Sequence, residues 1–377
     1  MVRIDTTTMR NLFDPVQLGP LRLANRVFMA PLTRNRADGD GVHGDLAMKY
    51  YAQRASAGLI VTEATQISPM GKGYINTPGI HSARQVAAWR RIVDAVHGEG
   101  GHIFLQLWHV GRISHSSLLP DTAPPLAPSA IRANAQTFIA TGFAPVSEPT
   151  EMSQAEIRNT IADYREAAQN AKAAGFDGVE IHAANGYLID QFLRSGSNQR
   201  ADRFGGSASN RVRFLLRVTE EVLGVWDSTR VGVRISPTGA FNDMKDDNPE
   251  QTFGTAVEHL SAYNIGYLHV VEAAQDGRES NEEEHAVLQT VRRLWKGCYV
   301  VNGGYDGPRG DAAVRSGYAD AVAYGRAFLA NPDLPHRLRI GATLNVPDHQ
   351  TFYGGDSKGY TDYPYFESLN NIQAGRP

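Results

Sequence analysis

The sequence predicts a (β/α)8 TIM barrel, the α/β fold in which eight parallel strands alternate with helices. Eight short apolar runs, rich in β-branched residues, alternate with amphipathic segments along most of the 377 residues. A chain of that length is ordinary for such a barrel with insertions. No Gly-x-Gly-x-x-Gly turn follows any predicted strand, which argues against a doubly wound dinucleotide-binding sheet. We therefore expect one barrel domain over residues 1–377.

The predicted strands are short apolar runs of the kind found in fully buried parallel sheets. In chain order they are residues 27–30, 59–65, 102–108, 178–182, 231–236, 267–272, 298–303 and 320–325. Helical periodicity falls between them, for example over 85–97, 153–174, 209–223 and 250–263. Ser153 and Glu156 form a capping box at the start of one helix, and Pro249 suits the first turn of another.

Two segments depart from this alternation. Residues 110–150 are rich in Pro, Ser and Ala and connect the third strand to its helix. Such an excursion lies at the C-terminal face of a barrel, so we predict that it forms a lid. Residues 342–377 contain the stretch Phe352-Tyr353-Gly-Gly355 and other turn-forming residues, and we predict a C-terminal tail over the active site.

Composition excludes several classes of partner. Hydrophobic residues make up 42% of the chain and charged residues 20%, which is enough apolar material for a large core. The formal net charge is −3 with no long run of either sign, so we expect neither nucleic acid nor a membrane surface as a partner. No apolar run is long enough to span a membrane, and the first residues lack the apolar core of a secretory signal. These features predict a cytoplasmic protein.

The sequence predicts no metal site. Cys298 is the only cysteine, which excludes internal disulfides and cysteine-ligated metal centres. His102, His109 and His115 have no carboxylate at ligand spacing, and there is no His-Glu-x-x-His motif. We predict that these histidines are structural.

A polar cluster follows the fourth predicted strand. His182 and Asn185 are three residues apart, so they can direct two hydrogen-bond donors at one small-molecule oxygen. Tyr187 follows with a hydroxyl that could deliver a proton nearby. The alternative is a polar strand end with an aromatic side chain that only packs.

Arg234 lies inside an apolar strand, where an unpaired charge is very costly. It either pairs with Glu180 or Glu63 inside the barrel, or it also faces an electron-rich ligand, and the spacing is compatible with both.

The ends of the last two predicted strands suggest a phosphate site. Gly303 and Gly304 follow one strand, and Gly325 and Arg326 follow the other. Glycines allow backbone N–H groups to approach an anion, an arginine can bind phosphate with two donors, and barrels commonly bind phosphate in these loops. The alternative is a pair of tight turns with a solvated arginine.

Longer stretches match a known family in order from residue 11 to 364. They include Asn25-Arg-Val-Phe-Met-Ala-Pro-Leu-Thr33-Arg, Gly58-Leu-Ile-Val-Thr-Glu63, Gln106-Leu-Trp-His-Val-Gly-Arg112, Gly175-Phe-Asp-Gly-Val-Glu-Ile-His-Ala-Ala-Asn-Gly-Tyr187, Asn198-Gln-Arg-Ala-Asp202-Arg-Phe-Gly-Gly-Ser207, Val300-Val-Asn-Gly-Gly304, Gly325-Arg-Ala-Phe-Leu-Ala-Asn-Pro332 and the tail from Phe352 to Pro364. On these residues the chain resembles the Old Yellow Enzyme family of FMN-dependent ene-reductases, and most closely its bacterial branch of nitrate-ester and N-ethylmaleimide reductases.

The resemblance implies a tightly bound, non-covalent FMN. Thr33 would hydrogen-bond to the flavin carbonyl next to N5, Gln106 would bind the pyrimidine edge, and Arg234 would lie near N1 and C2=O. Further residues would line the ring (Pro31, Leu32 and Ala64) or hold the phosphate (Gly303, Gly304, Gly325 and Arg326).

The resemblance also implies a ping-pong mechanism. NADPH or NADH would pass hydride to flavin N5 and leave, and an activated alkene would take its place. His182 and Asn185 would bind the carbonyl or nitro oxygen of the substrate, and Tyr187 would protonate the α-carbon after hydride reaches the β-carbon. The pocket would be lined by Tyr74, Trp108 and Tyr353.

Other functions compete with ene reduction. Nitrate-ester or nitroaromatic reduction would use the same site, and a non-catalytic flavin-binding protein would bind FMN without turnover. A phosphosugar isomerase or aldolase would need a strand-end lysine or a carboxylate pair, and no such lysine is present. The protein is expected to be a monomer or a homodimer.

Overall fold

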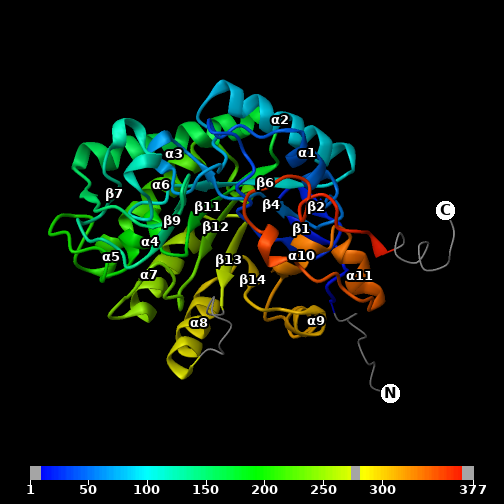
Figure 1. Cartoon of the computed structure of the whole chain (residues 1–377). Helices are drawn as coiled ribbons and strands as arrows, with labels where there is room; N and C mark the ends of the chain where they lie inside the picture. Colours follow the sequence, from blue (N-terminus) through cyan, green and yellow to red (C-terminus); the bar gives the residue numbers. More distant parts are fainter. Residues whose placement is uncertain (1–9, 273–280, 367–377) are drawn as a thin grey trace, which may run out of the picture.

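The structure, a computed structural model, describes residues 10–272 and 281–366. Its centre is a closed parallel barrel surrounded by helices, which confirms the predicted fold class (Figure 1). The barrel closes because β11 pairs with β12 on one side and with β6 on the other. The strands are β3 (Val27–Met29), β4 (Ile60–Val61), β5 (Thr65–Gln66), β6 (Ile103–Trp108), β11 (Gly178–Ala183), β12 (Val231–Ile235), β13 (Tyr267–Val271), β14 (Cys298–Asn302) and β15 (Ala321–Tyr324).

The second predicted strand is interrupted, so the prediction of one strand over 59–65 is wrong. The run forms β4 and β5, and residues 62–64 between them leave the ladder. At this point the backbone N–H of Gln106 on β6 donates to Oγ1 of Thr62 at 3.1 Å rather than to a backbone carbonyl. A side chain has replaced a main-chain acceptor, so regular pairing stops.

A hairpin that the sequence did not predict packs against the barrel interior. It consists of β1 (Val16–Leu18) and β2 (Leu21–Leu23), which pair antiparallel. Its buried leucines share a core with Phe28 of β3, Leu59 directly before β4 and Tyr267, the first residue of β13. The hairpin therefore covers the N-terminal end of the barrel, where α/β barrels do not place chemistry.

The surrounding helices follow the predicted pattern with one break. Ser153 caps α3 (Gln154–Ala174) through the predicted capping box, and Pro249 begins α7 (Pro249–Ala262). The single helix predicted over 209–223 is wrong, because it divides at Val212 into α5 (Ala208–Arg211) and α6 (Arg213–Leu223). The other helices are α1 (Asp45–Ala52), α2 (Ala83–Gly98), α4 (Leu188–Leu193), α8 (Glu282–Leu294), α9 (Gly307–Arg315), α10 (Arg326–Ala330) and α11 (Leu334–Ile340).

The segment 110–150 contains short strands. β8 (Gln136–Ile139) and β9 (Gly142–Pro145) form an antiparallel hairpin, and β7 (Leu126–Ala127) pairs in parallel with β10 (Thr150–Glu151). In the tail, a 3-10 turn covers His349–Thr351. Within residues 10–272 and 281–366, no helix combines the length and apolarity needed to cross a membrane.

Two glycines inside the barrel give space to aromatic rings. A Cβ on Gly232 would lie 2.2 Å from the ring of Tyr267, its neighbour on β13, and a Cβ on Gly178 would lie 2.4 Å from the ring of Phe104. Neither approach is compatible with van der Waals contact, and a closed barrel cannot move one strand independently.

We predict that Gly232→Ala lowers the free energy of unfolding by about 1–3 kcal/mol or more, because the ring of Tyr267 must move within a packed core. Guanidinium denaturation of both proteins measures the change. Gly98→Ala is the matched control, because nothing lies within 4 Å of its added Cβ at the end of α2. That variant should keep or slightly raise stability. Equal stability of the two variants would contradict the packing argument.

Candidate active site

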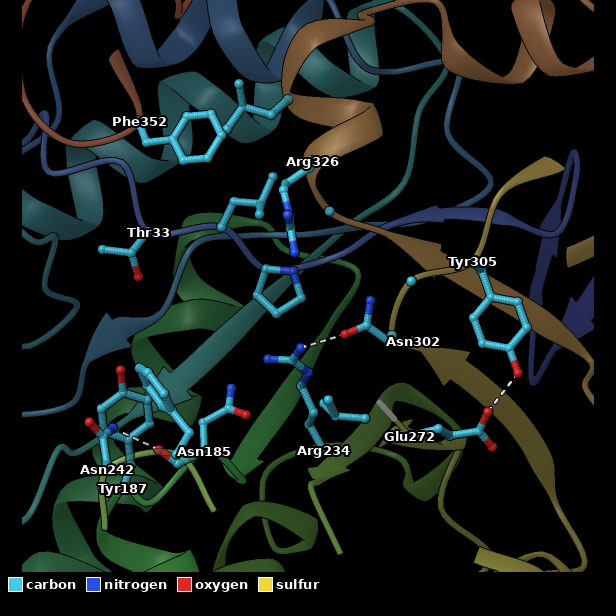
Figure 2. Close-up of a pocket in the computed structure, with 18 of the residues that line it drawn as sticks. Thr33, Asn185, Tyr187, Arg234, Asn242, Glu272, Asn302, Tyr305, Arg326 and Phe352 are labelled. Atoms are coloured by element: carbon cyan, nitrogen blue, oxygen red, sulfur yellow. Dashed lines mark hydrogen bonds between the residues drawn. The ribbon is translucent and has the colours of Figure 1, made fainter. Parts of the chain in front are cut away.

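A cavity of about 1590 Å³ opens where the barrel strands end at their C-terminal face. It is lined by residues of β12, β13 and β14 and by the segments that follow β3, β11, β14 and β15, which is where barrel enzymes place their chemistry (Figure 2). Most of the residues selected from the sequence meet here. They are Pro31, Leu32, Thr33, Tyr74, Asn185, Tyr187, Arg234, Gly303, Gly304, Gly325, Arg326 and Tyr353.

Four selected residues lie behind this lining. Ala64, Gln106, Trp108 and His182 are at most 5% exposed. Trp108 stacks on Tyr74 at 5.8 Å between ring centroids and meets Tyr187 edge-on at 5.1 Å. His182 also packs edge-on against the Tyr187 ring, at 5.1 Å. These side chains fix the position of the residues that reach the cavity.

The turn after β11 places the polar cluster. Asn185 and Gly186 both have left-handed backbone, with φ of 60° and 74°, and Tyr187 then caps α4. The Asn185 N–H donates to Oγ of Ser236 at 2.8 Å, and the Gly186 N–H donates to Oδ2 of Asp190 at 2.8 Å. This tight turn connects β11 to α4 within four residues and places Asn185 and Tyr187 at one cavity.

Asn242 is a site residue that the sequence analysis missed. It lies on the β12–α7 loop, lines the cavity, and donates from Nδ2 to the carbonyl of Asn185 at 2.8 Å (Figure 2). A Cβ on Gly186 would lie 2.7 Å from Cβ of Asn242, so the loop and the turn are in close contact. The pair Asn242-Asp243, with φ of 61° and 60°, is the type of sequence that tolerates left-handed backbone and marks such a turn.

The protonation states of the cluster follow from its burial. Burial raises the pKa of Tyr187 well above its ordinary value, and the neighbouring Tyr74 raises it further. The two hydroxyls are 3.1 Å apart. Burial, followed by the positive charge of Arg234, holds the pKa of His182 well below its usual range. At neutral pH the cluster therefore contains a protonated phenol and a neutral imidazole with one N–H to donate.

Arg234 is 7% exposed and is held between two strands of the barrel. Its Nη2 donates to Oδ1 of Asn302 at 2.9 Å, and the charge of Glu180 attracts it. Its Nε is buried without a hydrogen-bond partner within the described residues. Pairing with Glu63 is wrong, because that carboxylate faces Tyr51 and the backbone of Arg34 instead.

Glu180 is the fully buried anion that balances Arg234. Gln106 donates to it at 2.7 Å and Tyr267 at 3.0 Å, and Nδ1 of His269 lies at 2.8 Å. Burial alone would raise the pKa of Glu180, but His269, Arg234 and the hydrogen bonds together lower it below the usual value. Burial lowers the pKa of His269, so a neutral ring that donates from Nδ1 satisfies the pair.

The glycines after β14 leave open space at the cavity wall. Gly303 and Gly304 have φ of 128° and 68°, and no atom of residues 10–272 and 281–366 lies within 4 Å of a Cβ built on Gly304. Gly325 and Arg326 line the same cavity from the end of β15. The backbone of these glycines and the guanidinium of Arg326 therefore border a space that a phosphate group can enter.

A second buried network holds the tail beside the cavity. Arg34 is fully buried and donates to the carbonyls of Phe352, Thr351 and Gly359 at 2.7–3.2 Å. Its own backbone N–H donates to Glu63 at 3.2 Å. Because Arg34 directly follows Thr33, one segment forms part of the cavity wall and also anchors the tail that brings Phe352 and Tyr353 to it.

The histidines considered for a metal have other contacts. Nδ1 of His109 accepts a hydrogen bond from the N–H of Gly111 at 3.0 Å. The side chain of His115 accepts one from the N–H of Ser117 and so caps a 3-10 turn. Within the described part of the chain, no three His, Cys, Asp or Glu side chains are grouped to hold a metal ion.

The fold and the polar cavity at its C-terminal face define a barrel enzyme. Residues 11–345 match the NADH:flavin oxidoreductase / NADH oxidase family, and the chain belongs to that family. It is an FMN-dependent oxidoreductase of the Old Yellow Enzyme type.

Relatives are similar over nearly their whole length. The chain is 44% identical over 374 residues to 12-oxophytodienoate reductase 7 of Oryza sativa subsp. japonica, covering 94% of each chain. It is 46% identical to the structure of morphinone reductase, with a TM-score of 0.91 over 96% of this chain and 99% of that one. The Old Yellow Enzyme homologue from Zymomonas mobilis gives 44% identity and a TM-score of 0.91, over 94% and 99% of the two chains.

We predict that Glu63 makes stability depend on pH near neutrality. Burial raises the pKa of Glu63 from its ordinary value of 4.5 to about 7 in the folded protein. The protonated carboxyl therefore contributes to the free energy of unfolding. This contribution is complete below pH 4.5 and is lost as the pH rises through 7. Between these values the protein should lose roughly 3 kcal/mol relative to Glu63→Gln. Urea denaturation at a series of pH values measures both profiles. The free energies of unfolding of the two proteins should change in parallel above pH ~7.5. Parallel changes over the whole pH range would contradict the prediction.

Proposed function

We propose that the protein reduces the C=C bond of activated alkenes with hydride from NADPH or NADH. The observation that carries the proposal is the geometry of one cavity. A phenol that keeps its proton, Tyr187, is packed against a neutral His182 beside Asn185, and the same cavity continues to Arg234 and the glycine turns.

The residues around the cavity fit FMN. Arg234 has a buried Nε without a partner in the described chain, and a Cβ added to Gly304 would meet no described atom within 4 Å. We assign the ring to Thr33, Gln106 and Arg234, with Pro31, Leu32 and Ala64 beside it, and the phosphate to Gly303, Gly304, Gly325 and Arg326. When bound, FMN supplies a two-electron carrier between the nicotinamide and the alkene.

The His182–Asn185 pair activates the substrate. Asn185 lines the cavity, and Nδ1 of His182, which packs against the Tyr187 ring, has no hydrogen-bond partner among the described residues. We assign both side chains as donors to one carbonyl or nitro oxygen, which draws electron density from the conjugated C=C bond and makes the β-carbon electrophilic. His182 can do so without adding a charge, because its pKa is depressed. Ser236 and Asn242 hold the backbone of Asn185, so this donor needs little reorganisation when the oxygen gains charge.

Tyr187 delivers the proton to the α-carbon from its hydroxyl. Burial opposes loss of this proton, whereas the hydrogen bond from Asn242 lowers the pKa of Tyr187 and so favours the deprotonated oxygen. The hydroxyl of Tyr74, 3.1 Å away, is the neighbouring group from which a proton can be replaced.

We propose that residues 1–377 form one domain. The segment 110–150 acts as a lid of its active site, and the C-terminal tail from residue 342 also covers that site. Phe138 and Phe143 on the β8–β9 hairpin line the cavity, as do Phe352 and Tyr353 on the tail. With Tyr74 and the buried Trp108 they would enclose a flat apolar substrate and exclude water.

Nitro compounds and nitrate esters are further proposed substrates, because the same two donors suit their oxygens. A flavin-binding protein without turnover is the alternative that kinetics must exclude. The cytoplasmic location and the choice between monomer and homodimer are proposals from the sequence alone, to be tested by cell fractionation and size-exclusion chromatography.

We predict that Tyr187→Phe slows reoxidation of the reduced enzyme by 2-cyclohexenone about 10²-fold or more, because the α-carbon loses its proton donor. Anaerobic bleaching by NADPH should be nearly unchanged, since that half-reaction needs no proton from Tyr187. Stopped-flow absorbance of the flavin follows both steps. Equal slowing of the two half-reactions would contradict the role of Tyr187, and bleaching without reoxidation by any alkene or nitrate ester in the unmodified protein would favour a binding protein.

We predict that Arg326→Gln raises the FMN dissociation constant about 10- to 100-fold, because a charge-assisted contact to phosphate is lost. Fluorescence titration of the apoprotein with FMN measures it. Arg309→Gln is the matched control, since Arg309 also lines the cavity but lies over the Tyr305 ring at 4.5 Å. An equal effect of both substitutions would show that net charge, rather than a phosphate contact, is responsible.

A further inference from the structure

Asn302 is the last residue of β14, and it contacts Arg234 across an intervening strand. β13 lies between β12 and β14, yet Nη2 of Arg234 reaches Oδ1 of Asn302 at 2.9 Å. Nδ2 of Asn302 in turn donates to the carbonyl of Ala323 on β15 at 2.7 Å. Figure 2 shows the Arg234 and Asn302 side chains pointing toward one another. One amide thus links the guanidinium on β12 to β14 and β15.

The two partners determine which way this amide faces. A guanidinium only donates hydrogen bonds, and a backbone carbonyl only accepts them. Asn302 offers an acceptor to Arg234 and a donor to Ala323, whereas an aspartate would turn an acceptor toward the Ala323 carbonyl. The backbone of Asn302 is also held, because its carbonyl accepts the N–H of Glu272 at 2.8 Å. The acceptor therefore has a fixed place.

The opposing attraction on Arg234 comes from Glu180. That carboxylate is fully buried, and its two oxygens already accept hydrogen bonds from Gln106 and Tyr267. It attracts the guanidinium through its charge rather than by a direct hydrogen bond within the described residues. Among the described residues, Asn302 thus supplies the hydrogen-bond acceptor for Arg234, whereas Glu180 supplies the opposite charge.

We propose that Asn302 is a positioning residue, which holds the charge of Arg234 at the cavity and through it strengthens FMN binding and raises the midpoint potential of bound FMN. A fixed positive charge favours the form of a ligand that carries more negative charge, which for a flavin is the reduced form. The inference rests on the proposed function, in which FMN occupies this cavity beside Arg234.

Two substitutions test the inference with readouts other than turnover. In Asn302→Ala, the loss of one hydrogen bond to a charged group should raise the FMN dissociation constant about tenfold. If the reduced form weakens tenfold more than the oxidised form, the two-electron potential becomes more negative by about 30 mV. Asn302→Asp retains an acceptor for Arg234, but the new carboxylate partly cancels the charge of Arg234. The midpoint potential of FMN in this variant should therefore fall at least as far as in Asn302→Ala. If one of the two variants does not fold, the other is sufficient to test the inference.

A double-mutant cycle shows whether Asn302 acts through Arg234. If it does, Asn302→Ala should change the potential of Arg234→Lys much less than that of the unmodified protein. Tyr305→Phe is the matched control, because it removes a neutral hydroxyl that lines the same cavity and donates to Glu272 at 2.6 Å. Its potential and FMN affinity should not change.

Unchanged affinity and potential in both Asn302 variants would overturn the inference, as would a full effect of Asn302→Ala in the Arg234→Lys background. Failure of the unmodified protein to bind FMN would instead overturn the proposed function, so the two failures are distinguishable.

Discussion

The site depends on one constraint, which is the placing of a positive charge inside a closed barrel. Arg234 is 7% exposed on a strand whose other residues are apolar, and burial lowers its pKa. An isolated charge at such a depth would be very costly. Glu180 supplies the opposite charge and Asn302 supplies an acceptor, so the guanidinium stays at the cavity. Gln106, Tyr267 and His269 are held in turn by Glu180.

The segments around the cavity are anchored by buried arginines that bind backbone carbonyls. Arg34 holds the tail through Phe352, and Arg112 donates to the carbonyl of Asp243 at 2.9 Å in the loop that carries Asn242. Irregular segments have unpaired carbonyls, and a guanidinium with five donors can satisfy several at once. Residues on loops therefore reach the precision that catalysis by fixed donors requires.

The barrel could be predicted from the sequence because fully buried parallel strands are short apolar runs that alternate with helices. The prediction was wrong where a single side chain decided the local structure. Thr62 replaces a backbone acceptor and divides the second strand, and periodicity carries no trace of that exchange. The packing of the β1–β2 hairpin against the barrel and the contact of Arg234 with Asn302 could not be predicted either, because both join residues far apart in the chain. Glu180, in contrast, was among the partners that the spacing allowed for Arg234.

The sequence by itself determined the order of strands and helices, the residues at strand ends and the chemistry available there. Motifs such as His182-Ala-Ala-Asn185-Gly-Tyr187 are local, so residue types and spacing were enough to select them. Only the tertiary structure decided which of them share a cavity, that Gln106, Trp108 and His182 lie behind its lining, and that Asn242 belongs to the site. The physical reason is that barrel closure brings distant strand ends together, and burial then determines the protonation of each group.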